Sequence, residues 1–203
     1  MNKPQKVSLS LILALILLFP FHGCKVTEQA KMVSNLVNCD FQIRSVENVN
    51  LGGVNFQYVN SISDLGISDM TRLLAIFASP SFPLSLQINI IGRNPNASSA
   101  GLNRLEWILF IDDSQMTTGI LDKPFVIPAN NGTAIIPVAI GMDLKQALKG
   151  ESAQALINFA MNLAGVGSKA SRIKIKIKPT IMIGKSPLTY PGYITVRTEF
   201  TGK

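Results

Sequence analysis

The stretch LSLQINI at residues 84–90 alternates apolar and polar side chains without interruption. Because successive side chains of a β-strand point to opposite faces, this alternation predicts a strand with one buried and one solvated face. The strand leads into Arg93-Asn94-Pro95-Asn96, and this motif predicts a turn, since proline fixes its own backbone and biases the preceding residue away from helix. The fold is therefore expected to be built around β-structure.

Short apolar or alternating runs continue on both sides of this strand. Two of the connections carry turn signals, Asp112-Asp113 and the Asn131-Gly132 pair within 128–132, and the second signals a hairpin between its flanking strands. Short strands joined by short turns favour antiparallel sheets packed as a β-sandwich. The further strands are expected at 41–46, 49–56, 102–111, 115–121, 125–127, 133–140, 172–180, 181–183 and 193–200.

Two segments have helical rather than strand periodicity. The segment 68–78 begins with Ser68, a potential N-cap. The segment 152–163 begins with Ser152, another potential N-cap, and ends before Gly165, a typical helix stop. The first helix is expected to cover one end of a sheet. The predicted fold class is mainly β, an antiparallel β-sandwich with two added helices.

The N-terminus has the organisation of a secretory signal. Lys3 and Lys6 precede an uncharged run, whose apolar part from Leu9 to Phe19 is roughly 17 Å long as a helix, against roughly 30 Å for a bilayer core. This length favours a signal peptide over residues 1–23 rather than a membrane span.

Gly23-Cys24 at the end of this run resembles the lipobox of bacterial lipoproteins. The resemblance implies cleavage between Gly23 and Cys24 and attachment of diacylglycerol to the Cys24 thiol. Two or more acyl chains hold a protein stably at a membrane, so no spanning helix is needed. There are two alternatives. One is an ordinary signal peptide in which the cysteine occurs by chance, and the other is a membrane anchor that is retained in the protein.

Three segments are therefore expected in the chain. Residues 1–23 are the signal peptide, 24–39 the lipidated N-terminus and tether, and 40–203 the β-sandwich domain. The tether allows a short helical stretch through Val33, Leu36 and Val37. The expected location is the cell envelope, by default the outer membrane facing the periplasm, because Lys25 follows Cys24 and no acidic retention signal is present.

The composition argues against several kinds of chemistry. The only histidine, His22, leaves with the signal peptide, so the mature chain lacks the commonest general base and metal ligand. The charge of +7 falls to about +5 without Lys3 and Lys6, and a secreted protein of that charge is not expected to bind nucleic acid.

The other polar groups suggest no cofactor or metal. Cys39 has no disulfide partner within the mature chain and is expected to be a partly buried apolar cysteine, with an intermolecular disulfide as the alternative. Asp112 and Asp113 are adjacent on a turn and point apart, which favours a solvated turn over a metal site. No catalytic residue is assigned.

The order of motifs from Leu86 to Val138 resembles the late embryogenesis abundant type 2 family, also called the water-stress and hypersensitive-response domain. The motifs are the strand with Asn94-Pro95-Asn96, the strand 105–111 with Trp107, the acidic turn, Gly119 and the apolar strand 135–138. The two helices resemble the longer bacterial lipoprotein members. The resemblance implies a fibronectin- or immunoglobulin-like sandwich and a non-catalytic, often stress-related role.

Three features are candidate sites. Asn94, Pro95 and Asn96 are expected to organise a corner of the fold, with a ligand-binding loop as the alternative. Strand 172–178 places Ile173, Ile175 and Ile177 on one face. The opposite face carries the basic stripe, which we define as Arg172, Lys174, Lys176 and Lys178.

The basic stripe suggests contact with anionic lipid headgroups or an acidic envelope protein, each cation contributing roughly 1 kcal/mol near an anionic surface. The alternative is a solvated strand whose lysines prevent edge-to-edge pairing. Apolar residues in and beside the two predicted helices either form part of the core or line a cavity for an acyl chain. These residues are Phe77, Phe82, Leu156, Phe159, Met161 and Leu163.

The sequence thus predicts a non-enzymatic envelope lipoprotein that acts as an interaction or stress-protective module. The alternative function is a carrier of a lipid or another hydrophobic ligand. A hydrolase is disfavoured because the mature chain has neither histidine nor a Gly-x-Ser-x-Gly motif.

Overall fold

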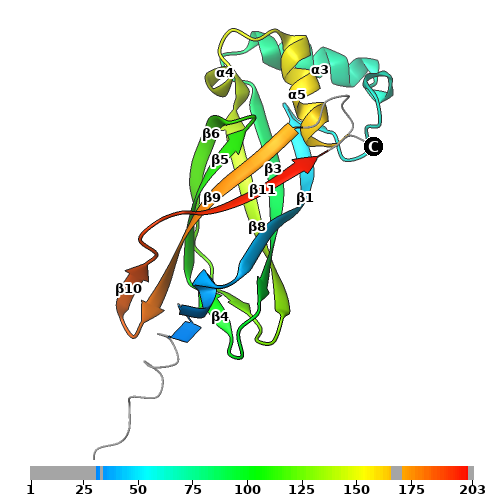
Figure 1. Cartoon of the computed structure of the whole chain (residues 1–203). Helices are drawn as coiled ribbons and strands as arrows, with labels where there is room; N and C mark the ends of the chain where they lie inside the picture. The colour runs from blue at the N-terminus through cyan, green and yellow to red at the C-terminus, as the bar shows by residue number, and fades with distance from the viewer. Residues whose placement is uncertain (1–30, 33, 166–170, 201–203) are drawn as a thin grey trace, which may run out of the picture.

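The computed structural model of the protein describes residues 31–32, 34–165 and 171–200. Two antiparallel sheets face each other and bury an apolar core between them (Figure 1). The first sheet has the order β2-β1-β3-β8, with bounds β1 Asp40–Leu51, β2 Val54–Asn55, β3 Pro83–Asn94 and β8 Gly132–Asp143.

The second sheet has the order β10-β9-β5-β6, and β11 also pairs with β9. Its bounds are β5 Arg104–Ile111, β6 Ser114–Leu121, β9 Ser171–Ile183, β10 Ser186–Thr189 and β11 Ile194–Phe200. A separate two-stranded sheet pairs β4 Ala100–Leu102 with β7 Phe125–Ile127. The predicted mainly β, antiparallel sandwich is confirmed.

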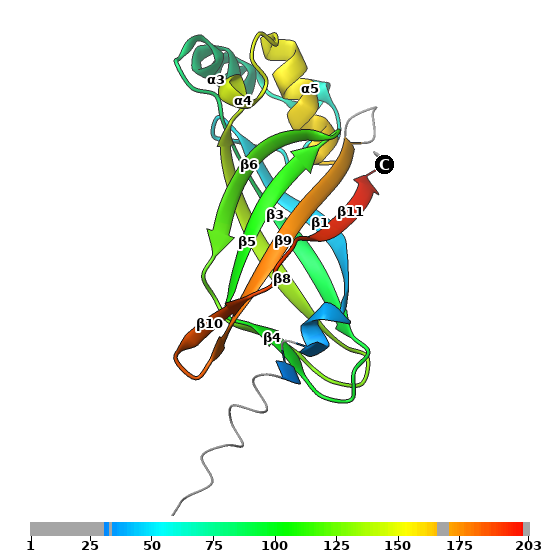
Figure 2. The ribbon, with the colours of Figure 1, turned by 60° about the vertical axis from the view of Figure 1, so that its left-hand side comes forward.

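The helices between residues 62 and 163 gather at one end of the sandwich, which we call the helix end (Figures 1 and 2). The first long helix thus covers an end of the sandwich, as the sequence suggested. The opposite end carries β4, β10 and residues 31–39, and we call it the tether end. The helices are η1 Ile62–Asp64, α3 Ile67–Ala78, α4 Leu144–Ala147 and α5 Ala153–Leu163.

One of the two predicted helix caps is confirmed. The Ser152 hydroxyl accepts a hydrogen bond from the Ala155 N–H at 3.2 Å, and α5 stops before Gly165, which has φ +77°. The prediction for Ser68 was wrong, because α3 begins after Gly66, whose missing side chain makes no capping bond. A serine two residues further on lies inside the helix, where it cannot cap it.

The predicted hairpin at Asn131-Gly132 was also wrong. Asn130 and Asn131 do adopt the positive φ values of a tight turn, 56° and 62°. The strands on either side, however, join different sheets, because β7 pairs with β4 and β8 pairs with β3. The turn is anchored instead on the Asn-Pro-Asn corner, where the Asn131 N–H donates to the Asn94 carbonyl at 2.8 Å.

The final strands differ from the expected pieces. Strand β9 is continuous through Pro179, whereas the sequence suggested a break near residue 180. Pro179 lies where β9 changes partner from β11, which pairs up to Ile177, to β10, which pairs from Thr180. No strand pairs with β9 at Pro179 on that side, so the missing N–H of proline is tolerated there. Strand β10 carried no clear sequence signal.

Candidate functional site

The Asn-Pro-Asn corner is a buried polar network at the tether end. Asn94 is fully buried, and its Nδ2 donates to the carbonyls of Ser98 at 2.9 Å and Ile127 at 3.1 Å. Its Oδ1 accepts from the N–H and from the Nδ2 of Asn96, at 3.0 and 2.7 Å. Every polar atom of the Asn94 amide is thus used within the fold, which agrees with a fold-organising corner.

The same corner holds the segment that precedes the domain. Asn96 Nδ2 donates to the Asn35 carbonyl at 2.9 Å, and Asn35 Nδ2 donates to the Ser98 hydroxyl at 2.7 Å. Leu36, in a helical turn over 34–37, is 3% exposed and belongs to the core. The boundary at residue 40 therefore falls just after a segment that already packs against the sandwich.

Cys39 lies beside this corner and is buried, as expected for an apolar cysteine. Its Sγ donates to the Asn35 carbonyl at 3.3 Å. Burial, and secondarily the nearby Asp40 carboxylate, raise the pKa of the Cys39 thiol to about 11. The thiol therefore remains protonated and unreactive at neutral pH.

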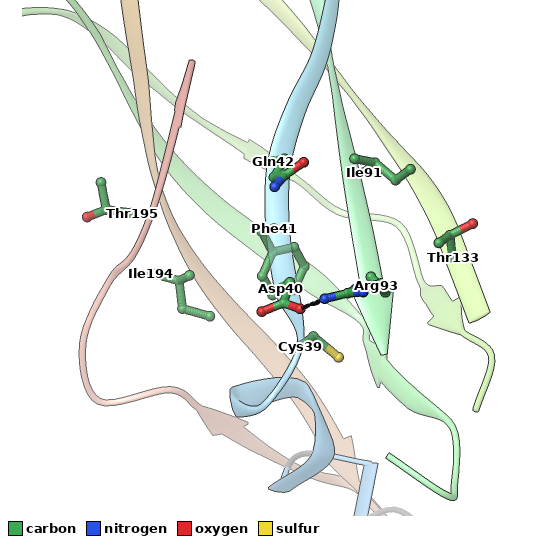
Figure 3. Close-up of a pocket in the computed structure, with 9 residues that line it drawn as sticks. All are labelled: Cys39, Asp40, Phe41, Gln42, Ile91, Arg93, Thr133, Ile194 and Thr195. Carbon is green, nitrogen blue, oxygen red and sulfur yellow. Dashed lines mark hydrogen bonds and ion pairs between the residues drawn. The ribbon is translucent and has the colours of Figure 1, made fainter. Parts of the chain in front are cut away.

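An open groove lies at the edge of the sandwich where the two sheets separate, between β1 and β11 (Figure 3). Its volume is about 730 Å³. An exposed ion pair lies in it, with Arg93 Nη2 at 2.7 Å from Asp40 Oδ2. The groove was not predicted, because its walls come from residues far apart in the sequence: Cys39, Asp40, Phe41, Gln42, Ile91, Arg93, Thr133, Ile194 and Thr195.

The basic stripe lies along the outer face of β9, with Ile173, Ile175 and Ile177 buried on the opposite face. At its helix end the stripe is partly neutralised by the β5–β6 turn. Lys174 Nζ lies 2.8 Å from Asp113 Oδ1, and Arg172 Nη2 lies 3.5 Å from Asp113 Oδ2. The hydrogen bond and charge of Lys174, and the charge of Arg172, lower the pKa of Asp113.

In the tether-end half of the stripe, the lysines lie next to aromatic rings. Lys174 and Lys176 Nζ lie 4.8 and 5.1 Å from the centre of the Phe110 ring, and Lys178 Nζ lies 5.7 Å from that of Tyr193. Among the described residues, the ion pairs involve Arg172 and Lys174 but not Lys176 and Lys178. In the register of β5 with β9, Lys176 lies opposite Ile108 and Lys178 lies opposite Glu106.

Protection of a sheet edge does not explain the stripe. From Ile173 to Ile177, strand β9 pairs with β5 on one side and β11 on the other. The stripe is therefore an interior row of a sheet face. The sequence could not show this, because the position of a strand within its sheet depends on pairings with distant segments.

The apolar residues considered for a ligand cavity pack as core. Phe82, Leu156, Met161 and Leu163 are each at most 4% exposed. The Phe77 and Phe82 rings meet edge to face, 5.9 Å between centroids. These contacts agree with the core interpretation rather than with a lipid pocket.

The predicted lipidation and cleavage residues, Gly23 and Cys24, lie outside the described residues. Within the described part of the chain, no helix is long and apolar enough to cross a membrane. Nor does that part bring together three or more histidine, cysteine or acidic side chains that could hold a metal ion. Asp112 and Asp113 form the expected turn, and their φ values are 47° and 66°.

The fold and these features define a class: an antiparallel β-sandwich with a helical cap at one end and a buried asparagine corner at the other. No family model matches the chain, and no curated protein matches it. Solved structures with some similarity include a protein from Archaeoglobus fulgidus, with 14% identity and a TM-score of 0.34 over 62% of this chain and 90% of that one.

Two further structures are similar to a comparable degree. AT1g01470 from Arabidopsis thaliana has 12% identity and a TM-score of 0.34, over 60% of this chain and 70% of that one. A protein described as late embryogenesis abundant (LEA), At2g46140.1, has 13% identity and a TM-score of 0.36, over 87% and 84%.

Proposed function

We propose that the chain is a lipid-anchored, non-enzymatic β-sandwich of the bacterial cell envelope that acts as an interaction or stress-protective module. The observation that carries the proposal is the docking of residues 35–39 on the Asn-Pro-Asn corner. Asn35 and Leu36 hold the start of the domain at one end of the sandwich, only a short segment after Cys24. A tether fixed in this way presents the sandwich to the envelope in a defined direction.

The sequence motifs of the late embryogenesis abundant type 2 family support a non-catalytic, stress-related role. The absence of histidine after residue 22 agrees with it. The carrier alternative has less support, because the side chains that would line its cavity pack as core.

Lipidation tests the anchor directly. The full chain, expressed in a two-membrane bacterium, should fractionate with the membranes, and mass spectrometry should find a thioether-linked diacylglycerol on Cys24. The Cys24→Ala variant should lose the modification and leave the membrane fraction. An unmodified thiol on a mature N-terminal Cys24 would contradict the proposal.

The outer face of the second sheet is the proposed partner surface. Lys176 and Lys178, on the half of the stripe without ion pairs, would contact an anionic partner in the envelope. Crosslinking in intact cells followed by affinity purification tests this. The double variant Lys176→Glu and Lys178→Glu should lose the captured partner.

A matched control changes the charge by the same amount at the helix end. Arg72 and Lys149 are exposed, and their replacement by glutamate should leave the captured partner unchanged. Equal capture by the stripe variant and the control variant would remove the stripe from the proposed function.

A further inference from the structure

Large apolar side chains are exposed at the tether end. Val37, Val126 and Leu188 have 49, 55 and 46% of their surface exposed. They come from the segment before β1, from β7 and from β10, so they are brought together only by the fold. We call these three residues, with Met32 and Phe125, the tether-end patch.

Two grooves at the end of the second sheet are lined by the residues of the patch. Met32, Phe125 and Val126 line a shallow groove of about 160 Å³, while Val37 and Leu188 line a smaller one. Ile181 of β9, which is 4% exposed, lines both grooves, so the two grooves adjoin each other. Apolar side chains exposed this close together indicate a contact surface.

Basic residues lie next to members of the patch in the chain. Lys31, Lys123 and Lys185 are exposed at this end, and Lys123 Nζ lies 5.8 Å from the centre of the Phe125 ring. Asp122, next to Lys123, is the acidic neighbour in the chain. An apolar surface bordered by lysines matches a bilayer interface, in which acyl chains lie beneath anionic headgroups.

The length of the tether selects this end of the molecule. Six residues separate Cys24 from Lys31, so their Cα atoms are at most about 25 Å apart when the segment is fully extended. The twelve residues of β3 run about 40 Å along the sandwich. A lipid on Cys24 therefore keeps the tether end near the membrane, whereas the helix end can reach it only if the domain lies on its side.

We propose that the tether-end patch inserts into the headgroup region of the leaflet that holds the Cys24 lipid, so that the helix end points away from the membrane. This inference rests on the proposed lipid anchor. It adds that the sandwich is oriented by its own surface, and that the patch rather than the basic stripe is the membrane contact.

Site-directed spin labels on the lipidated full-length protein test the orientation. Val126→Cys and Leu188→Cys place labels in the patch, in a Cys39→Ser background that removes the free thiol. Ile67→Cys and Leu74→Cys are the matched controls, because these exposed apolar residues lie on α3 at the helix end, 89 and 54% exposed. Each protein is purified from membranes and reconstituted in phosphatidylethanolamine–phosphatidylglycerol vesicles.

The expected result is that ascorbate reduces the labels at 126 and 188 several times more slowly on vesicles than in detergent-free solution, with no such change at 67 and 74. Adding Lys123→Glu and Lys185→Glu should shift the patch labels back toward solution rates. Equal ascorbate access at both ends of the vesicle-bound protein would overturn the inference and leave the anchor intact.

Two other outcomes also contradict the inference. Protection of 126 and 188 that appears at high protein concentration without vesicles would assign the patch to a second copy of the chain. A protein that carries an unmodified Cys24 and does not bind vesicles would overturn the proposed anchor, and the orientation with it.

Discussion

Asn94 shows how a single polar residue can organise the end of a β-sandwich. Its buried amide bonds to the carbonyls of Ser98 and Ile127 and to both nitrogens of Asn96. The sequence indicated a turn at this residue, since Pro95 follows it. That the amide would join β3 to the end of β7 was not visible, because Ile127 is 33 residues away.

Replacing Asn94 with alanine should lower the free energy of unfolding by about 3 kcal/mol, because two buried carbonyls lose their donor. Asn96→Ala is the control, since Asn96 is only partly buried, and it should cost about 1 kcal/mol. Urea unfolding followed by Trp107 fluorescence measures both. Equal losses in the two variants would contradict the central role of Asn94.

The buried Cys39 thiol should make stability depend on pH in the alkaline range. Its pKa is about 11 in the folded state and about 9 when exposed. The unfolded chain therefore loses this proton first as the pH rises. The stabilisation is complete below pH 9 and is lost between about pH 9 and 11.

The measurement for Cys39 is the difference in unfolding free energy between the wild type and Cys39→Ala at several pH values. This difference cancels the titration of lysines and tyrosines common to both proteins. It should shrink above pH 9, and a difference that is constant up to pH 11 would contradict the argument.

Helix caps act at the scale of the element. Ser152→Ala should destabilise the protein by about 1 kcal/mol, because the Ala155 N–H at the start of α5 loses its acceptor. Ser68→Ala is the matched control and should change stability by less than about 0.5 kcal/mol, since Ser68 caps nothing. Urea unfolding decides between them, and equal effects would refute the assignment of the caps.

The pairing of β5 with β6 depends on a glycine. Trp107 and Gly119 lie opposite each other in the register, and a Cβ on Gly119 would collide with the Trp107 ring. Gly119→Ala should therefore cost about 1–3 kcal/mol of stability through overpacking.

A strand glycine without such a neighbour provides the control for Gly119. Gly141 in β8 has no atom within 4 Å of an added Cβ, so Gly141→Ala should be tolerated or slightly stabilising. Thermal unfolding of the two variants gives the comparison. A Gly119→Ala protein as stable as Gly141→Ala would mean that the indole ring can move aside at no cost.

At the scale of the whole molecule, residues 34–39 pack on the sandwich and are expected to unfold together with it. A protein that begins at residue 40 lacks the buried Leu36 and the hydrogen bonds of Asn35. It should be less stable by about 3 kcal/mol than one that begins at residue 31. Denaturation of the two non-lipidated proteins tests this, and equal stabilities would show that the segment only rests on the surface.

The sequence alone determined most of the strands, though not β10 or the continuity of β9, and which of their faces are buried. Alternation such as that of 84–90 and 172–178 is a local property, because side chains of a strand point to opposite faces whatever the strand pairs with. The sequence also predicted the cap at Ser152 and the turn at Asp112-Asp113, since both depend on a few neighbouring residues.

Only the tertiary structure decided how these segments meet. It set the place of β9 inside its sheet, the docking of Asn35 on the asparagine corner, and the assembly of the tether-end patch from Val37, Val126 and Leu188. Each depends on contacts between residues that are far apart in the sequence. Such contacts follow from the packing of the two sheets as a whole, and the local pattern of side chains cannot specify them.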